Sequence, residues 1–283
     1  MKPVAFEYHA PVSLQKACEV LDEDADAAKI MGGSQSMGPM LNMRLVRPAK
    51  VIDVSRLPEL RCVSSDDASV HIGAAVTHAE IEDGVFPELR GGLMQTVAQD
   101  IAYRAVRTRG TIGGSLAHAD PAADWVVVCT ALGAQLTLVS SKGKRQVAMD
   151  DFMLGAYTTA LREGEIVTTI SVPRELASTR WAYRKFCRKT GEFAEASCAV
   201  WMDPERRFGR IVLGALDGAP CVLRELTTRF AAEGSDWLRS SSFKEALTTA
   251  VHNAARDRDG ADHRLIATVV RQTLEQFCEV IPA

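Results

Sequence analysis

Two short segments in which adjacent glycines stand beside hydroxyl side chains constrain this chain more than any other feature. The first is Ile30-Met31-Gly32-Gly33-Ser34-Gln35-Ser36-Met37-Gly38, and the second is Thr111-Ile112-Gly113-Gly114-Ser115. Paired glycines let the backbone approach a ligand closely, and successive N–H groups in such a loop can hold phosphate oxygens. Neither segment has the GxGxxG spacing of a Rossmann dinucleotide-binding motif or the lysine-containing pattern of a P-loop.

Each glycine pair taken singly is also typical of a tight turn between two elements. Two hydroxylated pairs in one chain favour another interpretation, in which a diphosphate is held from two sides. The residue pattern leaves open which dinucleotide would carry it. Asp124 follows the second segment and has two interpretations: a favourable charge near a helix N-terminus, or an acceptor for ribose or ribityl hydroxyls.

The hydrophobic periodicity predicts an α+β fold in which helices and strands do not alternate regularly. Helices are expected over 13–22 and 91–103, after an Asp120 cap, and through most of the chain beyond 218, and residues 40–45 are expected to form either a helix or a turn. The helix over 13–22 has Ser13 as its cap, and Thr77 and Glu80 have the spacing of a capping box. Strands are expected at 28–31, 50–54, either side of a turn at 65–68, in a hairpin over 134–149, at 165–173, and in three runs from 181 to 216. A domain boundary is expected near 175–180.

Composition excludes several classes of function. The 283 residues suffice for about two domains, and the net charge of -3 is spread along the chain, which argues against a nucleic-acid groove. No apolar run reaches the length of a membrane span, and the first residues lack the apolar region of a secretory signal. The seven cysteines include no CxxC pair, which favours a reducing compartment over a disulfide framework and offers no iron–sulfur ligand set. The six histidines are scattered and predict no metal site.

Three motifs together resemble one known family. They are MGGSQSMGPMLNMRLVRPAKVIDVSRLPEL, then RGTIGGSLAHADPAADW, then YRKFCRKTGEFAEAS. In this order they are similar to the FAD-binding medium subunits of molybdenum hydroxylases, the family of carbon monoxide dehydrogenase and bacterial xanthine dehydrogenases. The resemblance covers nearly the whole chain. It implies a two-lobed FAD-binding domain of the vanillyl-alcohol-oxidase type over 1–176, with lobes at about 1–56 and 57–176, and a smaller α+β domain over 177–283.

The resemblance also implies which residues contact FAD. The backbone of residues 30–37 and 111–115 is expected to hold the pyrophosphate, and further contacts are expected from Ile101, Asp124, Val167, Arg184 or Lys185, and Phe193. Judged from the residues alone, Val167 and Phe193 are equally typical of core packing, and one of the two alternating basic residues is expected to be solvated. Glu192 stands where the family usually has Asp. Because no histidine lies between His9 and His71, non-covalent FAD is expected.

The family further implies partners. Molybdopterin and two [2Fe–2S] clusters belong to a large and a small partner subunit, commonly in a dimer of heterotrimers, and electrons pass through FAD to an external acceptor. No catalytic residue of this chain is implied, although Lys185 is expected to stabilise reduced, anionic flavin. A cytoplasmic location is expected. Two alternatives remain open at this point: an assembly subunit that has lost FAD, and a stand-alone flavin oxidase of the same superfold.

Overall fold

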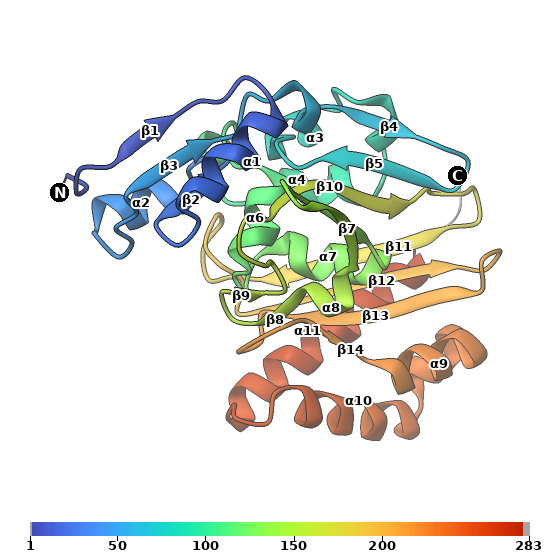
Figure 1. Cartoon of the computed structure of the whole chain (residues 1–283). Coiled ribbons are helices and arrows are strands. Elements are labelled where there is room, and N and C mark those ends of the chain that lie inside the picture. The colour runs from blue at the N-terminus through green and yellow to red at the C-terminus, as the bar shows by residue number, and fades with distance from the viewer. Residues whose placement is uncertain (1, 280–283) are drawn as a thin grey trace. The chain divides into compact units, whose positions relative to one another are not determined.

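The computed structural model describes residues 2–279, which form two compact units. The first unit comprises the chain up to Ala119, Ala134–Met153 and Thr158–Arg174. The second comprises Asp120–Gly133, Leu154–Tyr157 and the chain from Glu175 onward. Each unit combines helices with β-sheet (Figure 1), so the predicted α+β class is confirmed.

A three-stranded parallel sheet opens the first unit. Its order is β1 (Glu7–His9), β3 (Lys50–Asp53) and β2 (Ala28–Met31). Helix α1 (Leu14–Glu23) precedes β2, and the Ser13 hydroxyl accepts a hydrogen bond from the amide of Lys16, which confirms the predicted cap. The apolar stripe of α1 packs in one buried cluster with Ile52 of β3. This burial fixes which face of the sheet is covered.

A five-stranded antiparallel sheet completes the framework of the first unit. Its order is β4 (Val63–Ser65), β5 (Ser69–Gly73), β10 (Ile166–Pro173), β6 (Gln135–Ser140) and β7 (Gly143–Ala148). The strand pair around the turn at 65–68 and the hairpin from 135 to 148 are confirmed. Strand β10 shifts register between Val167 and Thr169, and the amide of Ala74 donates to the carbonyl of the bulged residue Thr168.

Short helices connect the strands of this unit. They are α2 (Met37–Asn42), η1 (Pro58–Leu60), α3 (His78–Glu82), η2 (Pro87–Leu89), α4 (Leu93–Gln99), α5 (Arg104–Arg107), α6 (Ile112–His118) and α8 (Met149–Phe152). The capping box of α3 is confirmed, since both of its hydrogen bonds form. Strands β8 (Met153–Gly155) and β9 (Thr158–Thr159) follow α8.

Three predicted elements of the first unit have different bounds. The helix expected to reach residue 103 ends at Gln99, and Ala102 then takes a left-handed φ of 43°. The segment expected to be a helix or a turn over 40–45 belongs in part to a helix that begins earlier, at Met37, and ends at Asn42. The second glycine segment was expected to be a loop, but its residues after Thr111 are the first turn of α6. A threonine hydroxyl that caps the helix compensates for the poor helical propensity of two glycines.

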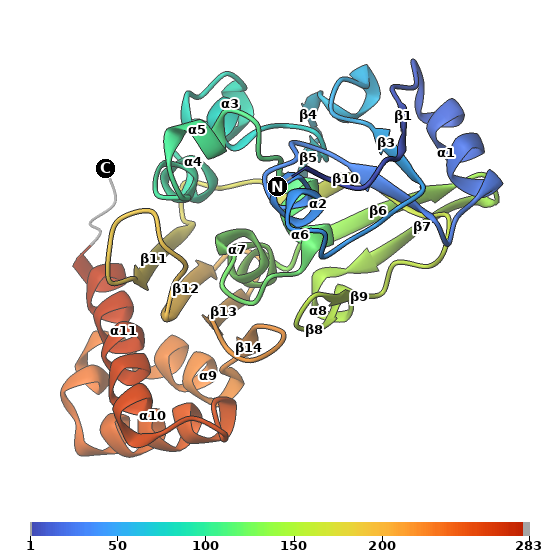
Figure 2. The ribbon, with the colours of Figure 1, turned by 90° about the vertical axis from the view of Figure 1, so that its left-hand side faces the viewer.

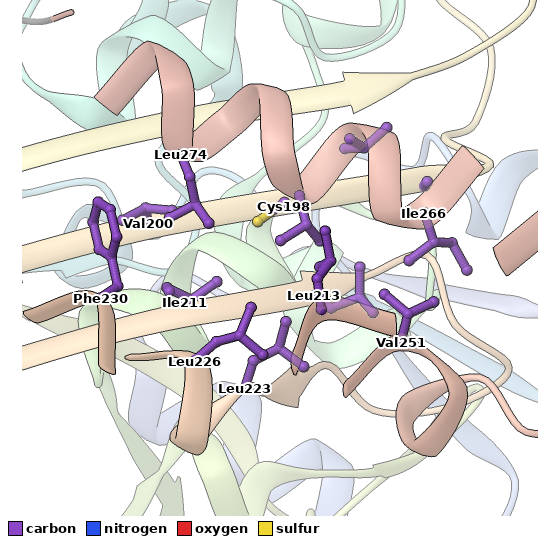
Figure 3. Close-up of a cluster of buried hydrophobic side chains, with 14 of the residues drawn as sticks. Cys198, Val200, Ile211, Leu213, Leu223, Leu226, Phe230, Val251, Ile266 and Leu274 are labelled. Carbon is purple, nitrogen blue, oxygen red and sulfur yellow. The ribbon is translucent and has the colours of Figure 1, made fainter. Parts of the chain in front are cut away.

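The second unit is built on an antiparallel sheet ordered β11 (Arg180–Phe186), β12 (Ala196–Asp203), β13 (Phe208–Gly214) and β14 (Cys221–Val222). Its helices are α7 (Asp124–Leu132), α9 (Arg224–Glu233), η3 (Gly234–Arg239), α10 (Ser241–Ala254) and α11 (Gly260–Glu279). Cys198 and Val200 face α11, and a continuous apolar core fills the space between the sheet and the C-terminal helices (Figure 3). Figure 2 shows α9, α10 and α11 beside the strands of this sheet.

Helix α7 covers the opposite face of the same sheet, because Ser197 alternates with the residues that face α11 and lies with Val127 beside Gly214. The start of this helix differs from the prediction. Asp120 does not cap it: its side chain accepts from the amide of Ala122 in a preceding turn, and Asp124 is the first helical residue. An aspartate side chain readily accepts a hydrogen bond from the backbone amide two residues later, which forms a turn. Here the side chain forms this turn instead of capping the helix.

Candidate cofactor-binding site

The first glycine segment leaves strand β2 and enters helix α2 within the first unit. Met31, the last residue of β2, pairs with Asp53 at the end of β3. Ser34 has a left-handed φ of 64°, and its carbonyl accepts from the amide of Gly38 at 3.0 Å. Among residues 2–279, none accepts a hydrogen bond from the backbone amides of residues 33–36. Four successive donors around a left-handed residue are suited to holding an anion.

The second glycine segment uses its amides differently. Thr111 Oγ1 accepts from the amide of Gly114 at 3.1 Å, and the amide of Ser115 donates to the Thr111 carbonyl at 3.0 Å. The amides of Ile112 and Gly113 donate to carbonyls of the segment that follows β5, at 3.0 and 2.9 Å. Residues 112–115 are thus anchored by protein acceptors. The groups of this segment that remain available to a ligand are chiefly its hydroxyl groups and the exposed backbone of its second glycine, Gly114.

The two segments touch each other, and the glycines make the contact possible. A Cβ atom added to Gly33 would lie 1.6 Å from the carbonyl oxygen of Arg109, just before the second segment. A Cβ on Gly32 would lie 2.8 Å from Thr111 Oγ1, and one on Gly114 would lie 2.7 Å from the same atom. The structure therefore brings residues 32–36 and 111–115 together around one threonine side chain, which is what a diphosphate held from two sides requires.

Residues 32–36 and 111–115 together form a cradle whose chemistry fits a diphosphate. It presents unpartnered amides from the first segment and the hydroxyl groups of Ser34, Ser36 and Ser115, and neither segment contains a carboxylate. Ile30 and Met31 close strand β2 before the cradle, and Gln35 Nε2 is bonded to the Gly33 carbonyl at 3.1 Å. Met37 starts α2 beyond it. Amide and hydroxyl donors in a site that holds no carboxylate favour an anion.

Buried His78 lies directly behind the second segment. A Cβ on Gly110 would come within 2.8 Å of its Nε2 atom, and its backbone amide donates to the Gly110 carbonyl at 2.9 Å. Burial, with a smaller contribution from the Arg107 charge, lowers the pKa of His78 to about 4. The imidazole is therefore neutral at physiological pH and acts as packing beneath the site.

A second group of predicted residues meets within the second unit. Asp124 Oδ1 accepts from the hydroxyl of Tyr183 at 2.6 Å and from Lys185 Nζ at 2.8 Å. The side chains of Asp124 and Lys185 are only 9% and 12% exposed, so this is a largely buried ion pair. Tyr183 and Lys185 lie two residues apart on β11 and share a face. Arg184 lies on the other face and is exposed, so of the two alternating cations it is the solvated one.

The remaining predicted contacts have varied surroundings. Ile101 is half-buried beyond the end of α4, and its carbonyl accepts from Arg107 at 2.9 Å. Val167 is buried and lies next to the bulge of β10. Phe193 is 71% exposed, which rules out the core-packing interpretation. The sequence interpretation missed Tyr183, although its position two residues before a lysine on a predicted strand already placed the two on one face.

Comparisons with known proteins agree with this geometry. Residues 4–175 match the family described as the FAD binding domain in molybdopterin dehydrogenase. The chain is 37% identical to the carbon monoxide dehydrogenase medium chain of Hydrogenophaga pseudoflava, over 91% of this chain and 86% of that one. It is 34% identical to the caffeine dehydrogenase subunit beta of a Pseudomonas species, over 78% and 76% of the two chains. A crystal structure of Cu,Mo-CO dehydrogenase superposes with a TM-score of 0.88 at 28% identity, over 98% and 99% of the chains.

These features define a flavin-nucleotide-binding subunit of an oxidoreductase. The chain belongs to the family of FAD-binding medium subunits of molybdopterin dehydrogenases, which confirms the resemblance read from the three motifs. FAD is accordingly its cofactor. No helix among residues 2–279 is both long and apolar enough to cross a membrane.

Proposed function

We propose that this chain takes electrons from [2Fe–2S] clusters on a small partner subunit and delivers them, through FAD, to an external acceptor. The observation that supports this role is the cradle of residues 32–36 and 111–115, with its unpartnered amides and no carboxylate, in a chain whose matched relatives are medium subunits of larger dehydrogenases. Bound FAD supplies the redox chemistry, and the protein supplies binding, orientation and electrostatics. The proposed partners are a large molybdopterin subunit and a small [2Fe–2S] subunit, in a dimer of heterotrimers.

The proposed work of this chain's own residues follows from their surroundings. The amides of residues 33–36 and the hydroxyl of Ser115 hold the FAD diphosphate. Ile101, Asp124, Val167 and Phe193 are the proposed further contacts. Lys185 is proposed as the cation that stabilises reduced flavin, with Asp124 holding its ammonium group at 2.8 Å. If the flavin midpoint potential of Lys185→Ala equals that of the wild type, this role of Lys185 is wrong.

We also propose that residues 1–176 form the FAD-binding domain, with lobes at 1–56 and 57–176, and that 177–283 form the C-terminal domain. The parallel sheet falls within the first lobe and the five-stranded sheet within the second, which supports this division. The segment Asp120–Gly133 belongs to the same compact unit as the strands after residue 175, so the proposed domain boundary in the sequence does not coincide with the division into two compact units. A cytoplasmic location is proposed from seven cysteines that are all free thiols.

Affinity for FAD tests the cradle. Ser115→Ala removes a hydroxyl that has no hydrogen-bond partner among the described residues, and we expect it to weaken FAD binding about ten-fold, the usual loss for a hydrogen bond to a charged group. The matched control is Ser64→Ala, an exposed serine on β4. Affinities come from titration of the flavin-free protein with FAD. Equal affinities in the two variants would contradict the role of Ser115.

Copurification tests the partner proposal against its two alternatives. Purification of the tagged chain from its native cells is expected to yield FAD together with a molybdenum-containing and an iron–sulfur subunit. A chain that binds these subunits but no FAD would be the assembly subunit. A chain that carries FAD alone and reduces oxygen with its own substrate would be the stand-alone oxidase.

A further inference from the structure

The loop over residues 187–194 connects β11 to β12 in the second unit and carries the exposed Phe193. Its base is closed at Glu195. The amide of this residue donates to the Phe186 carbonyl at 2.8 Å, and its carboxylate pairs with Arg188 at 2.6 Å. Among residues 2–279, the backbone of the loop itself forms no hydrogen bond with a segment outside it. The position of Phe193 therefore depends on how firmly Glu195 is held.

Arg258 reaches this base from the turn between α10 and α11. Its Nη1 atom donates to the Glu195 carbonyl at 3.2 Å, and its Nη2 atom donates to the Ala215 carbonyl at 2.7 Å. The side chain is only 18% exposed, although its ion-pair partner Asp217, at 3.3 Å, is 71% exposed. An exposed ion pair of this length contributes little. The guanidinium is therefore held mainly by two backbone carbonyls from different segments, which its planar set of donors can satisfy at once.

The second of these carbonyls connects Arg258 to the start of α7. Ala215 directly follows β13 and has a left-handed φ of 55°, a conformation that a non-glycine residue keeps only where its surroundings hold it. Its amide donates to the Pro121 carbonyl at 3.1 Å, three residues before Asp124. One guanidinium thus joins the base of the Phe193 loop to the segment that leads into α7.

The turn that carries Arg258 is itself fixed. The amide of Arg258 donates to the Ala255 carbonyl at 3.1 Å, and His263 Nε2 lies 2.7 Å from the same oxygen. Because a carbonyl oxygen can only accept, this nitrogen of His263 carries the hydrogen. His263 lies in the first turn of α11, a helix packed against β11 and β12 through buried apolar side chains. Arg258 is therefore a donor held in place at both ends of its side chain.

We propose that Arg258 is a positioning residue for the flavin, which fixes the base of the loop over 187–194 and thereby holds Phe193 where it contacts the isoalloxazine ring. The inference rests on the proposed contact of Phe193 with FAD. Arg258 acts on the cofactor only through Phe193, so its effect on FAD disappears when Phe193 is removed.

Limited proteolysis tests the hold on the loop without reference to the cofactor. The loop contains Arg188 and Lys189, after which trypsin cleaves, and both side chains are exposed. In the purified protein, with any subunits that copurify, Arg258→Gln is expected to raise the rate of cleavage at these two bonds about ten-fold, the usual effect of losing a hydrogen bond from a charged group. The matched control is Arg229→Gln, which removes another part-buried guanidinium of the same unit, bonded to Glu233 and Ser242. Equal rates of cleavage in the two variants would overturn the proposal.

Titration of the flavin-free protein with FAD tests the connection to the cofactor. Phe193→Ala is expected to weaken FAD binding about ten-fold through loss of an aromatic contact, and Arg258→Gln is expected to weaken it by a similar factor. The double variant is expected to bind FAD as Phe193→Ala does, within about two-fold. Arg258→Lys, which can reach one of the two carbonyls, is expected to recover part of the affinity. Arg229→Gln is expected to keep the wild-type affinity and the wild-type visible circular dichroism of bound FAD.

Two results would refute the positioning role. Additive losses in the double variant, or an equal loss of FAD affinity in Arg229→Gln, would mean that Arg258 only stabilises the fold. A different result identifies a failure of the proposed function instead. If Arg258→Gln accelerates cleavage of the loop while Phe193→Ala leaves the affinity and the circular dichroism of FAD unchanged, Arg258 holds the loop but Phe193 does not contact the flavin.

Discussion

Gly33→Ala perturbs the contact between the two glycine segments most directly. The added Cβ would lie 1.6 Å from the Arg109 carbonyl oxygen, 2.3 Å from its carbonyl carbon and 2.8 Å from the Cα of Gly110. All three atoms belong to the backbone, so no side-chain rotation relieves the clash. Restoring an ordinary contact requires the segments to separate by about 2 Å, and overpacking of this severity costs about 3 kcal/mol or more.

The expected consequence is a loss of both stability and FAD. A cost of about 3 kcal/mol lowers the thermal midpoint by roughly 6 °C or more in a protein of this size. Differential scanning fluorimetry measures the midpoint, and titration with FAD measures the affinity. Gly155→Ala is the control, since a Cβ there meets nothing within 4 Å. If Gly33→Ala keeps the midpoint and the FAD affinity of that control, the two segments do not touch in the way described.

Three further predictions concern stability. His78 is protonated near pH 6.5 in the unfolded chain and only near pH 4 in the folded chain. The stability that neutral, buried His78 contributes is therefore intact above about pH 6.5 and is lost as the pH falls toward 4. Between about pH 7.5 and 5, the free energy of unfolding in urea should fall by about 2 kcal/mol more for the wild type than for His78→Gln. Lys185→Met leaves the carboxylate of Asp124 buried without its cation and should cost about 3 kcal/mol in urea unfolding, and adding Asp124→Asn should recover most of it; independent, additive losses would contradict the ion pair. Ser13→Ala should cost about 1 kcal/mol through loss of the α1 cap, measured by thermal unfolding, and a cost equal to that of an exposed serine substitution would refute the cap.

The sequence correctly predicted the helix caps and the hairpin, which depend on residues close together in the chain. Ser13 and the Thr77 capping box satisfy backbone amides within one helical turn, so spacing alone was sufficient to identify them. The hairpin at 135–148 likewise depends on alternation and a short polar turn. The start of α7 was wrong because Asp120 had two local options, a cap or a turn, and the sequence contained no signal that distinguished them.

Contacts between segments far apart in the sequence could be identified only from the tertiary structure. The sequence determined that the chain has two hydroxylated glycine pairs, an α+β pattern and motifs of one family. It gave no indication that Gly33 rests on the carbonyl of Arg109, or that Tyr8 donates to Asp53. It also left Arg184 and Lys185 equivalent, and only the position of α7 on the face of this sheet gave Lys185 a carboxylate partner, Asp124. The physical reason is that spacing along the chain fixes periodicity and turns, whereas the partner of a polar group depends on which distant backbone is folded beside it.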